Sequence, residues 1–215
     1  MKVLNAYAGI GGNRKLWSGD LEITAIELNP QIAKIYRDFW PDDKVIVTDA
    51  HRYILDHFQD FDFIWSSPPC PTHSDVRYCR VVGGDERVTP VYPDMKLYEE
   101  IIFLKSYCLK KWVVENVVSY YNPLIKPQEI GKHYFWANFK INKQPIRCRE
   151  NDSGVHALQE LKGFDLAKYH LDSKIKILRN CVEPELGKHI FDCAFKGYKK
   201  MTDFMVMADG SASQK

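Results

Sequence analysis

The most reactive candidate in the sequence is a cysteine that follows two prolines, in the run Pro68-Pro69-Cys70. An apolar, strand-like segment, residues 61–65, precedes this run, so the prolines would hold the thiol in a rigid loop at a strand end. Earlier in the chain a glycine-rich turn, Gly9-Ile10-Gly11-Gly12, follows the first apolar segment. Such a turn is a candidate binding loop for a nucleotide-like group. Together these features predict covalent chemistry on one substrate beside a bound nucleoside.

Three carboxylates also follow predicted strands. Glu27 ends the second strand, where a carboxylate can accept hydrogen bonds from ribose hydroxyls, and Asp49 follows the third, where it could accept from an adenine amino group. Glu115 ends an apolar run, where burial would raise its pKa and let it donate to a ring nitrogen of a base. The alternative for each is a surface or helix-capping acid, and for the glycine loop a structural turn.

The candidate nucleophile needs a thiolate, whereas a free thiol is mostly protonated at neutral pH. We expect a helix start beside Cys70 to lower its pKa; the alternative is a buried structural thiol. The chain has six cysteines but no Cys-x-x-Cys pair, so we expect no metal site and reduced thiols.

Composition indicates a folded, soluble chain. The 215 residues are 45% hydrophobic, with a net charge of +2 and no apolar run of the roughly twenty residues that span a bilayer. We expect an intracellular protein. Residues 126–149 carry six Lys or Arg against one acid, which fits either a phosphate-binding surface or a solvated one.

Apolar segments that alternate between strand-like and helix-like patterns predict an α/β sheet with helices on both faces. Functional residues should then lie beyond the carboxyl ends of the strands. The predicted strands are 3–7, 21–27, 45–47, 61–65 and 112–115, with two more within 134–141. The predicted helices are 13–17, 30–39, 53–58, 94–110 and 183–195. Residues 68–93, with five prolines, are expected to be a long loop that closes over substrate.

Four motifs in order give the chain a family resemblance. These are the loop 5–12, with Tyr7 at a position that is usually phenylalanine; Ser67-Pro68-Pro69-Cys70-Pro71-Thr72-His73-Ser74; Glu115-Asn116-Val117; and Arg179-Asn180-Cys181-Val182. The chain resembles the cytosine-C5 methyltransferases that use S-adenosylmethionine. The segment 132–136 resembles small phage-encoded members in particular. The resemblance implies a Rossmann-like S-adenosylmethionine-binding fold and a cytoplasmic location in a prokaryotic or phage-infected cell.

The resemblance also implies roles for single residues. Cys70 would add to C6 of a flipped-out cytosine in duplex DNA, Glu115 would hold the N3 edge, and Asn116 would support the surrounding loop. Glu27 would hold the cofactor ribose, Asp49 the adenine amino group and Asn180 the methionine end. The remaining cofactor-binding residues would be Tyr7, Ala8, Gly9, Gly11 and Pro68, and Ser74 would face the DNA.

Two departures from the family pattern stand out. The usual Gln-x-Arg-x-Arg segment is replaced by residues 128–133, so Lys132, His133, Arg147 or Arg149 would have to take the place of its arginine. The region for target recognition is also short. We divide the chain into a catalytic domain (1–142), a reduced recognition region (143–178), a returning segment (179–200) and a tail (201–215). Such a small region predicts a short or relaxed target sequence.

Other readings remain open. A tRNA cytosine methyltransferase would suit the small recognition region, although the Cys-Phe-Thr tripeptide of that branch is absent. A non-catalytic DNA-binding decoy would not need both Cys70 and Glu115. An amino-methylating enzyme would carry an aromatic residue after Pro-Pro in place of cysteine. We expect a monomer that acts on duplex DNA; self-protection, evasion of host defence and restriction-modification are all open as biological roles.

Overall fold

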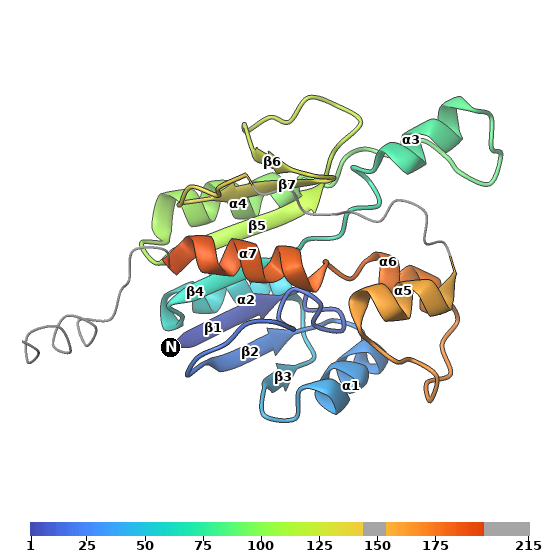
Figure 1. The fold of residues 1–215 in the computed structure, drawn as a ribbon. Helices are drawn as coiled ribbons and strands as arrows, with labels where there is room; N and C mark the ends of the chain where they lie inside the picture. The colour runs from blue at the N-terminus through green and yellow to red at the C-terminus, as the bar shows by residue number, and fades with distance from the viewer. Residues whose placement is uncertain (144–153, 196–215) are drawn as a thin grey trace, which may run out of the picture.

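The computed structural model of the chain describes residues 1–143 and 154–195. Its centre is a seven-stranded sheet in the order β3-β2-β1-β4-β5-β7-β6 (Figure 1). The first five strands in this order run parallel, and β7 pairs antiparallel with both β5 and β6. The strands are β1 Lys2–Ala6, β2 Glu22–Ile26, β3 Lys44–Ile46, β4 Phe63–Ser66, β5 Lys111–Val117, β6 Gln128–Ile130 and β7 His133–Ala137.

The strand order reverses between β1 and β4. The chain first moves outward from β1 to β3 and then crosses to the other side for β4 and β5. In open parallel sheets this reversal leaves a crevice beyond the carboxyl ends of the two central strands, where ligands bind. The glycine loop follows β1 and the Cys70 loop follows β4, so both open onto this crevice. The predicted α/β architecture is confirmed.

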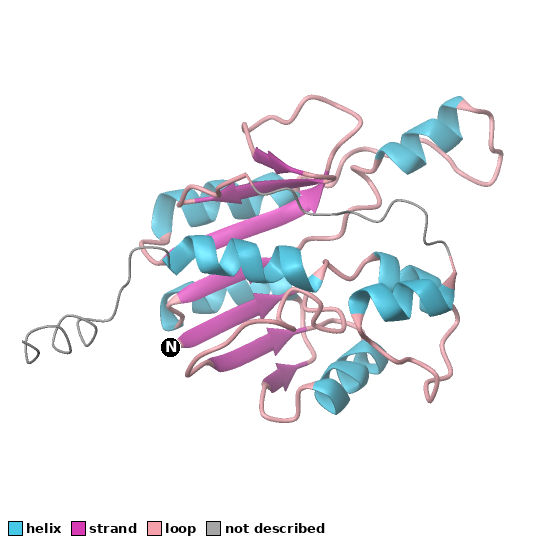
Figure 2. Cartoon of the chain, viewed as in Figure 1, coloured by secondary structure: helices cyan, strands magenta, loops and turns pink. Residues whose placement is uncertain are grey.

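Helices cover both faces of the sheet (Figures 1 and 2). They are α1 Pro30–Phe39, α2 Ala50–His57, α3 Asp75–Val82, α4 Lys96–Tyr107, α5 Val155–Lys162, α6 Lys174–Arg179 and α7 Pro184–Phe195, with a 3₁₀ turn at Phe58–Asp60. Because side chains alternate along a strand, Val3 packs toward α7 while Leu4 packs toward α2 and α4. Aromatic residues fill the α7 side, where Trp17 stacks on Phe191.

Helix α1 begins and ends where the sequence predicts. The Asn29 side chain accepts hydrogen bonds from the backbone N–H groups of Gln31 and Ile32, and Pro30 occupies the first helical position. This start fixes the chain directly after Glu27.

Three sequence expectations are wrong. Residues 13–17 form consecutive turns in place of a helix, because Asn13 is held by Asn5 and its backbone packs against Gly187. The expected loop 68–93 contains α3. Because none of the α3 residues is buried, the sequence has no apolar pattern there that would predict a helix. The segment 134–141 supplies a single strand, β7, and its partner β6 lies earlier in the chain. The tail 201–215 lies outside the described residues.

Candidate functional site

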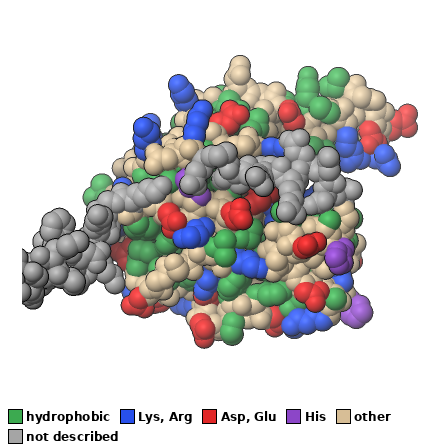
Figure 3. Space-filling view, in the orientation of Figure 1, with side chains coloured by type: hydrophobic (Ala, Val, Ile, Leu, Met, Phe, Trp, Pro, Cys, Tyr) green, Lys and Arg blue, Asp and Glu red, His purple; other side chains and the backbone are tan. Residues whose placement is uncertain are grey.

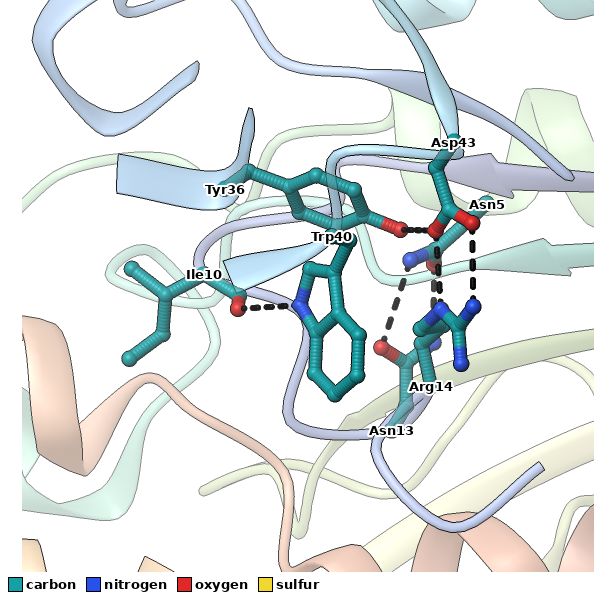
Figure 4. Close-up of polar contacts among 7 residues, drawn as sticks. All are labelled: Asn5, Ile10, Asn13, Arg14, Tyr36, Trp40 and Asp43. Carbon is teal, nitrogen blue, oxygen red and sulfur yellow. Dashed lines mark hydrogen bonds and ion pairs between the residues drawn. The ribbon is translucent and has the colours of Figure 1, made fainter. Parts of the chain in front are cut away.

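Side chains of the surrounding elements hold the glycine loop, residues 8–12, in place (Figure 4). The Trp40 indole N–H donates to the Ile10 carbonyl at 3.2 Å. Asn5 and Asn13 exchange side-chain hydrogen bonds of 2.8 and 3.4 Å. Because both amides are buried, this exchange satisfies groups that would otherwise lack partners. The loop is therefore held rigid without a ligand.

A second anchor involves Arg14, which stands where the dinucleotide-binding pattern Gly-x-Gly-x-x-Gly has its third glycine. Arg14 forms a two-pronged ion pair with Asp43, at 2.8 and 3.0 Å, and the Tyr36 hydroxyl donates to the same carboxylate at 2.8 Å. Arg14 also lies over the Trp40 ring. The arginine thus ties the end of the glycine loop to the far end of α1 (Figure 4).

Two glycines of the loop are required by close packing. Gly11 has φ +83°, and a Cβ there would lie 2.4 Å from the Trp40 indole nitrogen. A Cβ on Gly12 would lie 2.2 Å from the Cys181 sulfur. A side chain at either position would displace its neighbours. Gly12 therefore lets the returning segment near residue 181 reach the loop.

A cavity of about 380 Å³ lies between the glycine loop, Glu27 and α6, within the range of about 300–1,000 Å³ that small-molecule sites occupy. Of the predicted cofactor-binding residues, Tyr7, Ala8, Gly9, Glu27 and Asn180 line it. Gly11, Asp49 and Pro68 are not among the described lining residues. Gly11 packs on Trp40, and the Asp49 side chain caps α2 by accepting from the Arg52 N–H at 3.0 Å.

Glu27 is held by the backbone around it. One carboxylate oxygen accepts from the Gly9 N–H at 3.0 Å and the other from the Asn29 N–H at 2.8 Å. Burial raises the pKa of Glu27, and these backbone donors oppose that rise. A carboxylate has lone pairs left after two such bonds, so Glu27 can still accept from a pair of ligand hydroxyls.

Tyr7 joins the cavity to a buried polar cluster that the sequence analysis missed. Its hydroxyl donates to the Glu100 carboxyl group of α4. Glu100 also accepts from the Ser66 hydroxyl at 2.7 Å and contacts His51 Nδ1 at 2.9 Å. The bond to Glu100 raises the pKa of His51. Since Tyr7 has φ +55°, which is uncommon for a residue with a side chain, the cluster fixes the start of the glycine loop.

The Cys70 loop is tied to β5. Asn116 donates from its side-chain amide to the Pro68 carbonyl at 3.0 Å. The Cys70 carbonyl accepts from the N–H groups of His73 and Ser74, at 2.9 and 3.1 Å. These bonds fold the loop back beside the end of β5, next to Glu115.

Cys70 and Glu115 influence each other's protonation. Burial, and then the charge of Glu115, raise the pKa of the Cys70 thiol. The expectation of a lowered pKa is therefore wrong, because the thiol is partly buried and the charge that acts on it is that of a carboxylate. Burial raises the pKa of Glu115, as predicted, although His133 and a hydrogen bond from Ser67 oppose the rise.

Lys132, His133, Arg147 and Arg149 are the candidates to replace the arginine of the Gln-x-Arg-x-Arg segment. Of these, His133 reaches this site. Its Nε2 lies 3.7 Å from a Glu115 oxygen, and its buried Nδ1 has no hydrogen-bond partner in the described part of the chain. Lys132 is exposed at the turn between β6 and β7. Arg147 and Arg149 lie outside the described residues.

Ser74 begins a protruding arm, residues 74–94, that follows the Cys70 loop. Its hydroxyl caps α3 by accepting from the Val76 N–H at 3.2 Å. On α3, Tyr78 stacks face to face on Tyr120, with ring centroids 5.0 Å apart and planes within 1°. Figure 3 shows hydrophobic and charged side chains exposed together on this arm, at the right of the view.

A partly buried ion pair lies close to Cys181, which lines the cavity. The Lys162 ammonium contacts Glu183 at 2.7 Å and donates to the Cys181 carbonyl at 2.6 Å. Burial would raise the pKa of Glu183, but the charge and hydrogen bond of Lys162 bring it below its ordinary value. This pair joins α5 to the segment that reaches Gly12.

Comparisons with known proteins identify the fold. No family model matches the chain, and no curated protein matches it. The structure of the Entamoeba histolytica methyltransferase EhMeth is similar over 93% of this chain and 99% of that one, with 12% identity and a TM-score of 0.52. This likeness shows that the chain has a methyltransferase fold.

Two further structures are similar over smaller parts. A Spodoptera frugiperda DNMT2 mutant matches with 23% identity over 54% of this chain and 35% of that one, with a TM-score of 0.36. A DNA modification methyltransferase encoded within an Escherichia coli prophage matches with 14% identity over 74% of this chain and 54% of that one, with a TM-score of 0.43. Among the described residues, no helix is long and apolar enough to cross a membrane.

Proposed function

We propose that this protein is an S-adenosylmethionine-dependent methyltransferase that modifies C5 of a flipped-out cytosine in duplex DNA through a covalent bond to Cys70. The observation that carries the proposal is the convergence of Cys70 and Glu115. Both lie at the carboxyl ends of central strands, and the bond from Asn116 to the Pro68 carbonyl holds their loops together beside the glycine-loop cavity.

The cavity suits the nucleoside part of S-adenosylmethionine. Glu27 presents a partly buried carboxylate to a ribose diol, the glycine loop allows close approach of a ligand to the backbone, and Asn180 lines the same cavity. When bound, the cofactor supplies a methyl group on an electrophilic sulfonium. Asp49 stays a prediction for the adenine amino group, and Gly11 and Pro68 stay predicted cofactor-binding residues, because none of the three lines the cavity.

The chain's own residues divide the work on cytosine. The Cys70 thiolate adds to C6 of the ring, and the electron pair displaced toward C5 makes that carbon nucleophilic. Glu115, whose pKa is raised by burial, would in its protonated form donate to N3 and stabilise the charge that develops in the ring. After C5 has been methylated, a base takes the C5 proton and the sulfur leaves C6. Cys70 is thereby regenerated.

His133 is the best-placed substitute for the missing arginine. It faces Glu115, so a base held by Glu115 would lie within reach of its imidazole. Ser74, at the start of α3, and Lys132, in the turn between β6 and β7, are assigned to the flanking nucleic acid. Tyr78 of the arm 74–94 stacks on Tyr120, whose backbone N–H donates to the His73 carbonyl beside the Cys70 loop, and aromatic side chains can stack on bases.

The test is transfer of labelled methyl from S-adenosylmethionine to duplex DNA and, in parallel, to tRNA. We expect label in DNA, none with Cys70→Ala, and a covalent complex with a duplex that contains 5-fluorocytosine. Label in tRNA alone would reassign the substrate. Label in neither nucleic acid, with no covalent complex, would contradict methyl transfer altogether.

A further inference from the structure

Residues 154–180, here called the α5–α6 cap, lie on the cofactor side of the molecule. Leu158, Phe164 and Leu178 of the cap share a buried core with Ile10 of the glycine loop and Ile35 of α1. All three cap residues are almost completely buried. The sequence predicts that residues 143–178 serve target recognition; in the structure, the apolar residues of 154–180 cover α1.

Polar contacts fasten the cap along the length of α1. The Gln31 side chain donates to the His170 carbonyl at 2.9 Å, and the Tyr169 hydroxyl donates to Asp38 at 2.9 Å. At the other end, Lys15 donates to the Gly163 carbonyl. The cap is thus joined to both ends of α1 and to the segment that follows the glycine loop.

The cap brings charged side chains to the cavity. Among the described residues that line it, Lys176 is the only cation, and Asp172 and Glu27 are the acids. Glu27 is already assigned to a ribose. Lys176 lies four residues after Asp172 and four before Asn180, which also lines the cavity. No hydrogen bond or ion pair of the Lys176 ammonium is formed within residues 1–143 and 154–195.

We propose that the α5–α6 cap is the binding element for the amino-acid end of the cofactor, with Lys176 taking its carboxylate and Asp172 its ammonium. This inference rests on the proposed function. The methionine end of S-adenosylmethionine carries one negative and one positive group, and the cap supplies one side chain of each opposite sign. The cap's buried core holds the backbone that carries Lys176 and Asp172 against the glycine loop.

The test uses two ligands that differ only in the carboxylate, S-adenosylmethionine and its decarboxylated form. Calorimetry should show that Lys176→Ala weakens binding of S-adenosylmethionine about tenfold, the size of a charge-assisted hydrogen bond, and leaves the decarboxylated ligand unaffected. Arg179→Ala, a charge removal on the same helix outside the cavity lining, is the matched control and should bind both ligands like the unaltered protein. Thermal unfolding checks that both variants are folded.

Each other outcome is decisive. Equal affinity of Lys176→Ala and the unaltered protein for S-adenosylmethionine would overturn the assignment and leave the proposed function standing. An equal loss for both ligands would show that Lys176 acts on the shape of the cap and would overturn the carboxylate contact. If the unaltered protein bound neither ligand, the proposed function would fail, and the inference with it.

Discussion

The side-chain amide of Asn116 donates to the carbonyl of Pro68 at 3.0 Å, across 48 positions of sequence. Asn116 is 2% exposed, and its side-chain oxygen Oδ1 accepts a hydrogen bond from the Val117 N–H. The bond therefore couples the position of the candidate nucleophile, two residues after Pro68, to that of Glu115, one residue before Asn116. A tether of this kind sets the geometry of a site without touching a substrate.

Removing this tether should loosen the Cys70 loop. Asn116→Ala leaves the Pro68 carbonyl without its donor, which costs about 1–2 kcal/mol of unfolding free energy. Urea unfolding measures the loss, and Asn122→Ala, at an exposed position, should change stability by less than about 0.5 kcal/mol. Equal stabilities of the two variants would contradict a structural role for the bond.

The raised pKa of Cys70 predicts a slow thiol at neutral pH. Alkylation of Cys70 by iodoacetamide should speed up through the alkaline range, with a midpoint above the ordinary cysteine value of about 8.5, because burial and Glu115 both disfavour the thiolate. Glu115→Gln removes the second of these causes and should move the Cys70 midpoint down. Site-resolved mass spectrometry follows Cys70 separately from the other cysteines; a Cys70 midpoint at or below about 8.5 would refute the prediction.

Breaking the ion pair between Lys162 and Glu183 should lower the free energy of unfolding substantially. Lys162→Ala strands Glu183 beside the protein interior and should cost about 3 kcal/mol. The pair Lys188–Asp192 has a similar distance but is exposed, so Lys188→Ala should cost less than about 1 kcal/mol. The double variant Lys162→Met/Glu183→Leu should recover much of the lost stability. Failure of that recovery would mean that the Lys162 bond to the Cys181 carbonyl matters more than the ion pair.

The hydroxyl of Tyr7 should contribute to stability although the family usually has phenylalanine at this position. Tyr7→Phe removes a donor from the buried Glu100 carboxyl group and should lower the unfolding free energy by about 1 kcal/mol. Tyr53→Phe, at a partly exposed tyrosine outside the cluster, is the control. A Tyr7→Phe protein as stable as its parent would show that water replaces the hydroxyl.

Local signals predicted the parallel half of the fold well. Asn29 and Pro30 state the start of α1 in adjacent residues, and the buried strands read as short apolar runs. The rule that functional groups gather at strand ends predicts from the sequence alone that Cys70 and Glu115 lie at the same edge of the sheet. These inferences succeeded because each depends on neighbours in sequence or on a general property of parallel sheets.

Long-range packing accounts for what the sequence did not reveal. The apolar residues of α5 and α6 lie among lysines, so the stretch read as a charged surface, and Lys162 is buried because Glu183 faces it from a distant segment. Glu100 is a buried residue of α4, and the sequence of this helix does not indicate that a polar side chain there would be buried. The lowered pKa expected for Cys70 was wrong for a similar reason, since the fold buries the thiol and places beside it a carboxylate from β5.

The contact between Trp17 and α7 bears on how the chain folds during synthesis. Trp17 stacks on Phe191 at 5.0 Å and donates to the Gly187 carbonyl at 3.2 Å, while Val3, Phe63 and other sheet residues pack on the same helix. The apolar face of the sheet that α7 covers therefore stays exposed until residues 184–195 have left the ribosome. Nascent chains halted before α7 should be clients of chaperones, and native structure should appear late and nearly all at once.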